Sequence, residues 1–322
     1  MTASRYQREI SAAAALAVLL LLVAISAPSF FSAGNLRDLA INNSPALLVA
    51  TGMTLVILVG DIDISVASQF AVCSVACGWL VKQGIPIAVM VPMVLVAGML
   101  MGALNGALIA IAGLPSIIVT LAMLVAWRDA LRWATGGAWI QGLPTDFQWF
   151  GMSQGGAQWL MVGASFAIVI ATAWAMRAVT GVRGLYAVGS DADAARLVGL
   201  DPVRIRFAVF VAMGGLVAVS AVLNAVRFSS IPSNAGAGLE LKAIAAVVVG
   251  GTAITGGRGN LLGTCIGVAL LSVVGTALSF VGINPFWERA IQGFIILVAL
   301  GADYAFARLT PRPAPLASSH VG

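Results

Sequence analysis

Residues 10–27 read ISAAAALAVLLLLVAISA, an apolar run that follows a basic start containing Arg5 and Arg8. A helix needs ~20 consecutive apolar residues to cross the hydrocarbon core of a bilayer. The run is continuous and does not alternate between apolar and polar residues, so it predicts a helix. A cleaved signal peptide can look similar. Because many similar runs follow, we expect an uncleaved first membrane-spanning helix.

The rest of the chain has the same character. Of its 322 residues, 60% are hydrophobic and 9% are charged, and the mean hydropathy is +1.02. A soluble domain carries about 25% charged residues, so much of this surface is expected to face lipid. Backbone polar groups in lipid must be satisfied within the chain, which leaves helices or a closed barrel. The long unbroken runs favour an all-α integral membrane protein.

The apolar runs predict about ten membrane-spanning helices. They are expected near residues 10–27, 42–60, 64–81, 86–112, 115–134, 158–177, 207–226, 241–257, 261–281 and 286–306. The second and eighth of these are expected to be short. Residues 1–310 would form one polytopic transmembrane domain. The proline-rich and serine-rich residues 311–322 would form a disordered cytoplasmic tail.

An even number of crossings places both termini on one side of the membrane. The longest charged loop runs from Arg177 to Arg206. Basic residues collect on the cytoplasmic side of membrane proteins, so this loop and both termini are expected in the cytoplasm. The net charge of +5 is explained in the same way, without nucleic-acid binding. Residues 135–157 are then extracytoplasmic.

Missing residues exclude several kinds of chemistry. The single histidine, His320, lies in the tail, so no histidine can act as a base or a metal ligand within the membrane. Cys73, Cys77 and Cys265 lie in apolar runs and are read as small hydrophobic residues, which predicts neither a metal site nor a disulfide. No P-loop sequence occurs. The chain is therefore predicted to be a conduit without a cofactor and not an enzyme, and any ATP would be hydrolysed by another subunit.

Polar residues between the apolar runs are the functional candidates, because ionisable groups in a membrane are costly. Residues 60–65 read Gly-Asp-Ile-Asp-Ile-Ser. Asp61, Asp63 and Ser65 could line a polar path, or the carboxylates could cap the following helix. The two interpretations are compatible, because broken helices survive in membranes where they line a cavity.

Other polar residues occur near the ends of the predicted spans. Asn105 precedes a glycine, and Ser116 and Thr120 follow Pro115, which suits the first turn of a helix. Capping and packing explain these residues as well as transport does. Glu240 opens a short span, where the helix dipole favours a carboxylate.

A short helix is predicted within the charged loop. Asp191 or Ser190 can cap it, residues 194–197 favour a helix, and Gly199 can end it. A solvated loop is the plainer interpretation. A short capped helix outside the membrane is also what docking into the cleft of a partner requires.

Four segments, in order and with matching spacing, resemble the permease subunits of bacterial ABC sugar importers of the ribose, xylose and rhamnose type. They are residues 61–65, 114–121, 186–200 and 238–259. The resemblance covers nearly the whole chain. It implies a bacterial inner-membrane location, a cytoplasmic ABC ATPase, a second permease subunit and a periplasmic substrate-binding protein.

Residues 135–144, and residues 231–232 followed by 238–244, look most like the autoinducer-2 import subgroup, to which the rhamnose permeases are similar here. One of these two substrates is therefore favoured, and a heterodimer of permeases is favoured over a homodimer. The chain departs from the commoner pattern at Ala67, where the family often has glycine, and at Asp61, which precedes Ile62 where a second glycine is frequent. These departures leave the local helix break and the role of Asp61 open.

The resemblance also implies roles for individual residues. In that family the equivalent of residues 186–200 is a coupling helix that contacts the ATPase. The residues expected to couple to the ATPase are Gly189, Asp191, Ala194, Ala195, Arg196 and Gly199. The residues expected near the translocation path are Asp61, Asp63, Ser65, Asn105, Ser116, Thr120 and Glu240.

The expected mechanism is alternating access, in which closure of the ATPases moves the short helix and, through it, the spans. Other transporters are compatible with the same residues. An ABC permease for another monosaccharide, for branched-chain amino acids or for nucleosides would share the architecture. An ion-driven secondary carrier also uses broken helices and carboxylates near the bilayer midplane, and a passive channel is a third possibility.

Overall fold

A computed structural model gives the architecture of the chain and describes residues 7–284 and 287–309. Over these two ranges the chain folds into helices and contains no strand. One isolated antiparallel bridge joins Ile140 to Ile231. The all-α prediction is confirmed. The tail predicted at 311–322 lies outside the described residues.

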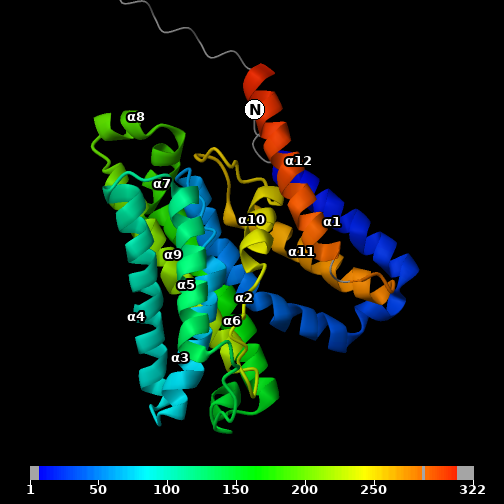
Figure 1. Cartoon of the computed structure of the whole chain (residues 1–322). Helices are drawn as coiled ribbons and strands as arrows, with labels where there is room; N and C mark the ends of the chain where they lie inside the picture. Colours follow the sequence, from blue (N-terminus) through cyan, green and yellow to red (C-terminus); the bar gives the residue numbers. More distant parts are fainter. Residues whose placement is uncertain (1–6, 285–286, 310–322) are drawn as a thin grey trace, which may run out of the picture.

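Most of the helices run along the long direction of the molecule (Figure 1). The first half contains α1 (Gln7–Ser26), α2 (Ala33–Leu58), α3 (Val66–Lys82), α4 (Ile87–Gly106), α5 (Ser116–Thr135) and α6 (Gln154–Ala178). The second half contains α7 (Thr180–Ser190), α8 (Ala192–Leu197), α9 (Pro202–Ala225), α10 (Leu239–Val249), α11 (Leu261–Phe280) and α12 (Trp287–Leu309). The short turns are η2 (Pro28–Phe31), a π-helical η3 (Ala107–Ile111) that continues α4, and η4 (Gln148–Gly151).

Six of the described helices are long and apolar enough to cross a membrane. They are α1, α2, α4 with η3, α6, α9 and α11. Each falls on a predicted span, so the prediction of an integral membrane protein is supported for these segments. The other predicted spans correspond to α3, α5, α10 and α12, which are shorter or carry charged residues.

Helix α2 was expected to be short, and this expectation was wrong. It has 26 residues and begins at Ala33. The helix starts there because the Ser32 hydroxyl accepts a hydrogen bond from the Asn35 amide at 3.4 Å. Pro45 lies inside α2, and the helix changes direction along its length (Figure 1). Proline removes one hydrogen bond from a helix interior, and we attribute the bend to it.

Two further elements differ from the predictions: the end of α10 and the presence of α7 (Thr180–Ser190). Helix α10 ends at Val249 and does not continue to 257. Gly250 and Gly251 follow, and Gly251 has φ +94°, a left-handed conformation that ends the helix. Helix α7 lies in a segment that was read as a loop. Its high glycine content weakens the helix signal, which packing against neighbouring helices overrides.

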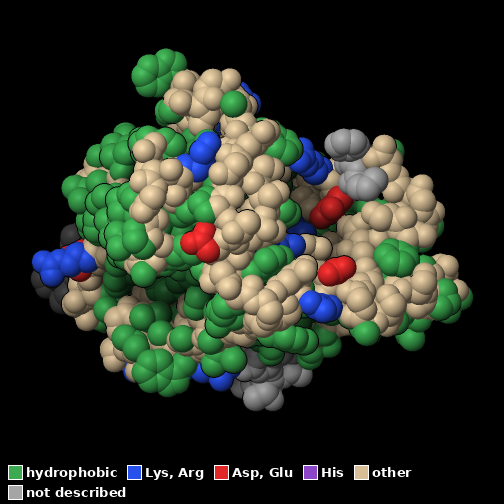
Figure 2. Space-filling view, turned by 90° about the horizontal axis from the view of Figure 1, so that it is seen from below, with side chains coloured by type: hydrophobic (Ala, Val, Ile, Leu, Met, Phe, Trp, Pro, Cys, Tyr) green, Lys and Arg blue, Asp and Glu red, His purple; other side chains and the backbone are tan. Residues whose placement is uncertain are grey.

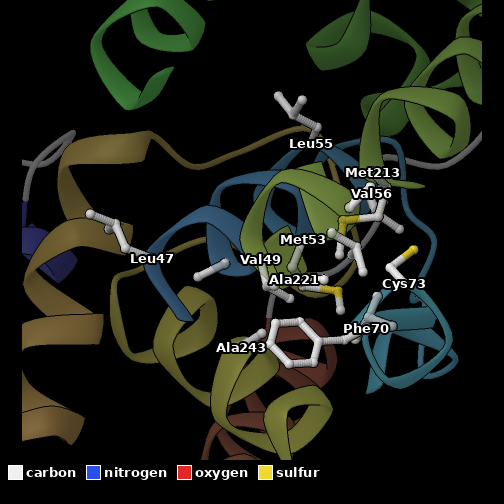
Figure 3. Packing of buried hydrophobic residues seen from close by; sticks show 14 of the residues in the cluster. Leu47, Val49, Met53, Leu55, Val56, Phe70, Cys73, Met213, Ala221 and Ala243 are labelled. Atoms are coloured by element: carbon white, nitrogen blue, oxygen red, sulfur yellow. The ribbon is translucent and has the colours of Figure 1, made fainter. Parts of the chain in front are cut away.

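Helix α2 lies at the centre of the bundle. Of the 18 residues in its most apolar stretch, 89% are buried, against 11% in that of α1. Figure 3 shows Val49, Met53 and Val56 of α2 among Met213 and Ala221 of α9 and Phe70 of α3. The contacts of α2 extend to α6, α10 and α11. The core is therefore built around one apolar helix.

Helix α4 has one face exposed at the surface and an opposite face packed against the bundle. Val96 and Leu100 are 55% and 64% exposed on one face, which suits contact with lipid. The opposite face carries glycines, and a Cβ atom on Gly102 would lie only 2.2 Å from the carbonyl oxygen of Phe210 on α9. Small residues allow such close helix packing in membranes. Figure 2 shows hydrophobic side chains covering the flank on the α4 side.

Candidate functional site

Most of the predicted site residues lie at the end of the bundle that carries α7 and α8, called here the α8 end (Figure 1). Segments far apart in sequence meet at this end. The Gly257 amide donates to the Leu58 carbonyl at 2.9 Å, and the Tyr186 hydroxyl donates to the Gly259 carbonyl at 3.0 Å. The end of α2, the end of α7 and the loop between α10 and α11 are thus bonded together.

A buried polar cluster, the Asp63 network, consists of Asp63, Ser65, Gln69 and Asn105. Oδ1 of Asp63 accepts hydrogen bonds from the Ser65 amide at 2.9 Å and the Ser65 hydroxyl at 2.5 Å. Nδ2 of Asn105 donates to Ser65 Oγ at 2.9 Å and to Asp63 Oδ2 at 3.4 Å. Nε2 of Gln69 donates to the same two atoms at 2.8 and 3.3 Å. The exposed fraction of all four residues is 0%.

The Asp63 network ties the start of α3 to α4. The Asp63 carboxylate accepts a hydrogen bond from the backbone amide of Ser65, the residue before α3. This is local capping of the kind that Asp side chains provide. Gln69 was not predicted as a site residue, although its position four residues after Ser65 places both on one helix face. Oε1 of Gln69 and Oδ1 of Asn105 have no hydrogen-bond partner among the described residues. The cluster is closed to solvent in this structure.

Ser116 and Thr120 hold the start of α5 against the same segment. The Ile62 amide donates to Ser116 Oγ at 3.4 Å. The Thr120 hydroxyl lies 3.3 Å from the Ile62 carbonyl and 2.8 Å from the Ser116 carbonyl, and it can donate to either. Residues 61–65 therefore connect to α3, α4 and α5.

Asp61 is paired with Arg206, near the start of α9. Nε and Nη2 of Arg206 donate to the two carboxylate oxygens of Asp61 at 2.7 and 2.6 Å. The exposed fractions are 3% for the Asp61 side chain and 33% for the Arg206 side chain. Such a two-pronged pair fixes both orientation and distance. Arg206 was not predicted as a site residue, because 145 positions separate it from Asp61.

Glu240 makes its described contacts elsewhere. Its Oε2 accepts from the Gly238 amide at 3.1 Å, at the start of α10. The neighbouring Lys242 donates to Asn43 of α2 at 2.9 Å and lies 3.6 Å from Glu288 of α12. Lys242 thus joins α10 to α2 and α12, whereas Glu240, two positions earlier on the helix, does not share its face. The structure does not bring Glu240 into the Asp63 network.

Four glycines at the α8 end, called here the glycine joint, bring three backbones together. They are Gly60, Gly189, Gly256 and Gly257. A Cβ atom on Gly189 would lie 1.8 Å from the Leu58 carbonyl oxygen and 2.6 Å from the Gly257 amide nitrogen. Approach this close is open only to glycine. Helix α7 therefore seats directly on the backbone of α2 and of the α10–α11 loop.

Helix α8 has the capped form that the sequence predicted. Oδ1 of Asp191 accepts from the amides of Asp193 and Ala194 at 2.9 and 3.0 Å. Gly199 has φ +82° just after the helix and ends it in the expected way. Ala195 is buried, whereas Leu197 and Val198 are 90% and 75% exposed. The helix thus presents apolar side chains outward.

Comparison with known proteins decides the family. Residues 35–300 match a family model described as the permease component of a branched-chain amino acid transport system. This chain belongs to that permease family. The permease is a multi-pass inner-membrane protein, in agreement with its apolar helices.

Curated relatives match the permease over most of its length. It is 34% identical over 298 residues to the autoinducer 2 import system permease protein LsrC of Enterobacter sp. (strain 638). The aligned region covers 92% of this chain and 86% of that relative. It is 33% identical over 298 residues to the ribose import permease protein RbsC of Escherichia coli (strain K12), covering 90% of this chain and 91% of that relative. No solved structure matches the permease.

The opposite end of the permease carries an open groove of about 560 Å³. It is lined by Arg132, Trp133, Gly136, Gly137, Trp139, Ser233 and Asn234. The Ser233 hydroxyl donates to the Gly137 carbonyl at 3.0 Å, which fixes the two lining segments to each other. No group of three or more His, Cys, Asp or Glu side chains that could hold a metal ion occurs in the described part of the permease.

Proposed function

We propose that this permease is the translocating subunit of a binding-protein-dependent ABC importer for a sugar or sugar-like molecule. The observation that carries the proposal is the similarity to autoinducer 2 and ribose import permeases over at least nine-tenths of the chain. Autoinducer 2 is the first candidate substrate and ribose the second. Rhamnose stays a prediction from the sequence.

The arrangement of the helices supports a chain that crosses the membrane ten times. Helices α1 to α6 and α9 to α12 would make the crossings, with α7 and α8 outside. The Asn260 side chain donates to Glu9 of α1 at 2.6 Å, which places the first turn of α1 at the α8 end. The basic residues of 177–206 favour a cytoplasmic position for this end by the positive-inside rule. Both termini would then be cytoplasmic.

Helix α8 would be the contact with a cytoplasmic ATPase. Its cap, its exposed Leu197 and Val198 and its position outside the bundle support this role. The coupling residues would be Gly189, Asp191, Ala194, Ala195, Arg196 and Gly199. Ala195 and Gly189 would act within the permease, because both are packed against its own helices.

Two further partners belong to the proposal. A periplasmic substrate-binding protein would deliver the substrate to the groove end, where the groove offers exposed tryptophan rings beside polar side chains. A second, different permease chain would complete the pathway. In that arrangement Asp61, Asp63, Ser65, Asn105, Ser116 and Thr120 would hold the cytoplasmic end of the path, and Glu240 would lie nearer its middle.

The family description supports a second candidate function, import of branched-chain amino acids. The same fold would serve, since the difference lies in the substrate and not in the architecture. The sugar candidate is preferred because the individual relatives that match over most of this chain are named for autoinducer 2 and ribose.

Uptake by the native host tests both candidates. The host with and without this gene would be given autoinducer 2, ribose, rhamnose and leucine, and the loss of each from the medium would be followed. Loss of autoinducer 2 or ribose uptake alone supports the sugar importer, whereas loss of leucine uptake alone supports the second candidate. Collapse of the proton gradient at constant ATP should leave uptake intact. Uptake that stops would instead indicate an ion-driven carrier.

A further inference from the structure

We propose that Arg206 and Tyr186 are positioning residues that transmit displacement of α7 and α8 to the segment 61–65 and to the α10–α11 loop. Asp61 and the glycine joint receive that displacement. The proposal rests on the proposed function and names the route by which an ATPase bound at α8 would reach the helices.

The first step is that α7, α8 and the start of α9 form one unit. The three helices contact one another. Oδ1 of Asp201 accepts from the amides of Val203 and Arg204 at 3.0 and 3.1 Å, which fixes the first turn of α9 directly after α8. A Cβ atom on Gly184 of α7 would lie 3.0 Å from the Ile205 side chain. Arg206 is carried on this unit.

The second step is the connection from this unit to the core. Arg206 holds Asp61 by two charge-assisted hydrogen bonds, and the Asp61 carboxylate is almost fully buried. Two residues later Asp63 is held in the network that joins α3 to α4. A displacement of the start of α9 is therefore passed, through the paired Arg206 and Asp61 side chains, to the start of α3, the end of α4 and the start of α5.

The third step is a parallel connection through α7. The Tyr186 hydroxyl bonds the Gly259 carbonyl at 3.0 Å, and Gly189 seats on Leu58 and Gly257. Asn260, the next residue after Gly259, caps α11 by accepting from the Gly263 amide at 2.8 Å. Displacement of α7 therefore reaches α11 as well as the end of α2. Contiguous rigid contacts of this kind can carry coupling between sites.

A simpler role for Arg206 is to neutralise the buried charge of Asp61, and the two roles make different predictions. Removing one partner of a buried pair destabilises a protein, because an uncompensated charge remains, whereas removing both partners is often tolerated. If neutralisation is the whole role, the double variant D61A/R206A recovers both protein amount and transport. If Arg206 transmits displacement, the double variant recovers the amount and still transports poorly.

The test uses the transporter purified from its host through a tag on the permease and placed in proteoliposomes with its binding protein. ATP hydrolysis and uptake of labelled autoinducer 2 and ribose are measured together. Variant R206K keeps the charge and loses the two-pronged geometry, and R204K is its matched control, because the Arg204 side chain is 88% exposed. Variant Y186F keeps the ring and removes the hydroxyl that bonds Gly259.

We expect R206K, Y186F and D61A/R206A to hydrolyse ATP while uptake per ATP falls at least roughly fivefold, and R204K to match the wild type. A wild-type ratio in R206K and Y186F, or full recovery in the double variant, would overturn the inference. A wild-type transporter that hydrolyses ATP without taking up either compound would instead contradict the proposed substrate class. The two failures are therefore distinguishable.

Discussion

Asn105 on α4 donates a 2.9 Å hydrogen bond to the hydroxyl of Ser65, the residue that precedes α3. The two residues stand 40 positions apart in the sequence and are completely buried. One amide therefore joins two helices and also helps to satisfy the Asp63 carboxylate, so the start of α3 depends on α4.

Replacing Asn105 with leucine should destabilise the permease. The change leaves Asp63 Oδ2 and Ser65 Oγ with one donor fewer in a buried site, which costs ~1–3 kcal/mol. The measurement is the thermal unfolding midpoint of the purified permease in detergent. The matched control N234L changes an exposed asparagine and should leave the midpoint within error. An unchanged midpoint in N105L would show that the network contributes little to stability.

Replacing Gly189 with alanine should separate α7 from α2. The new Cβ atom would overlap the Leu58 carbonyl oxygen, from which it would stand 1.8 Å away, so the helix must shift. We expect normal insertion with uptake reduced about tenfold, in the range of typical coupling energies. Variant G181A is the control, because a Cβ atom on Gly181, at the start of the same helix, meets nothing within 4 Å. Equal uptake in the two variants would argue against the joint.

Replacing Asp191 with alanine should weaken the hold of the ATPase. The change removes the cap of a six-residue helix. Loss of an N-cap costs ~1 kcal/mol of helix stability, which is enough to unfold a helix this short. The amount of ATPase that copurifies with the tagged permease is expected to fall. Variant D193A removes an exposed ion pair to Arg196, which is worth little, and should retain the ATPase. Normal copurification in D191A would place the ATPase contact elsewhere.

Replacing Gly102 with alanine should disrupt the packing of α4 on α9. The added methyl group would lie 2.2 Å from the Phe210 carbonyl oxygen, and overpacking costs ~1–3 kcal/mol. The amount of folded permease extracted from membranes should fall. Gly163 on α6 is the matched position, since a Cβ atom there meets nothing within 4 Å. If both variants accumulate equally, the contact between α4 and α9 can adjust freely.

The positions of the helices were largely predictable because lipid demands long apolar runs. The sequence also predicted the capped helix α8, since Asp191 and Gly199 act through neighbours in the chain. Local signals failed where contacts between distant segments decide the structure. The polar first part of α2 and the glycine-containing α7 have sequences that favour a helix only weakly. Packing against other helices stabilises the helical conformation there.

The candidate site was predictable only in part for the same reason. Asp63 and Ser65 are close in sequence, and Asn105 stood out as a polar residue in an apolar run. Their meeting with Gln69 depends on how α3 packs on α4. The partner of Asp61 could not be predicted, because the sequence does not distinguish Arg206 from the other arginines of the charged loop. Only the packing of α9 brings Arg206 to Asp61.

The length of α10 has a consequence for how the protein is made. Its 11 residues rise about 17 Å, roughly half of the ~30 Å hydrocarbon core, so irregular backbone on either side must be shielded by protein. The contacts of α10 with α2, α11 and α12 provide that shield. Since α11 and α12 leave the ribosome after α10, this segment can settle at its final depth only once the end of the chain has been synthesised.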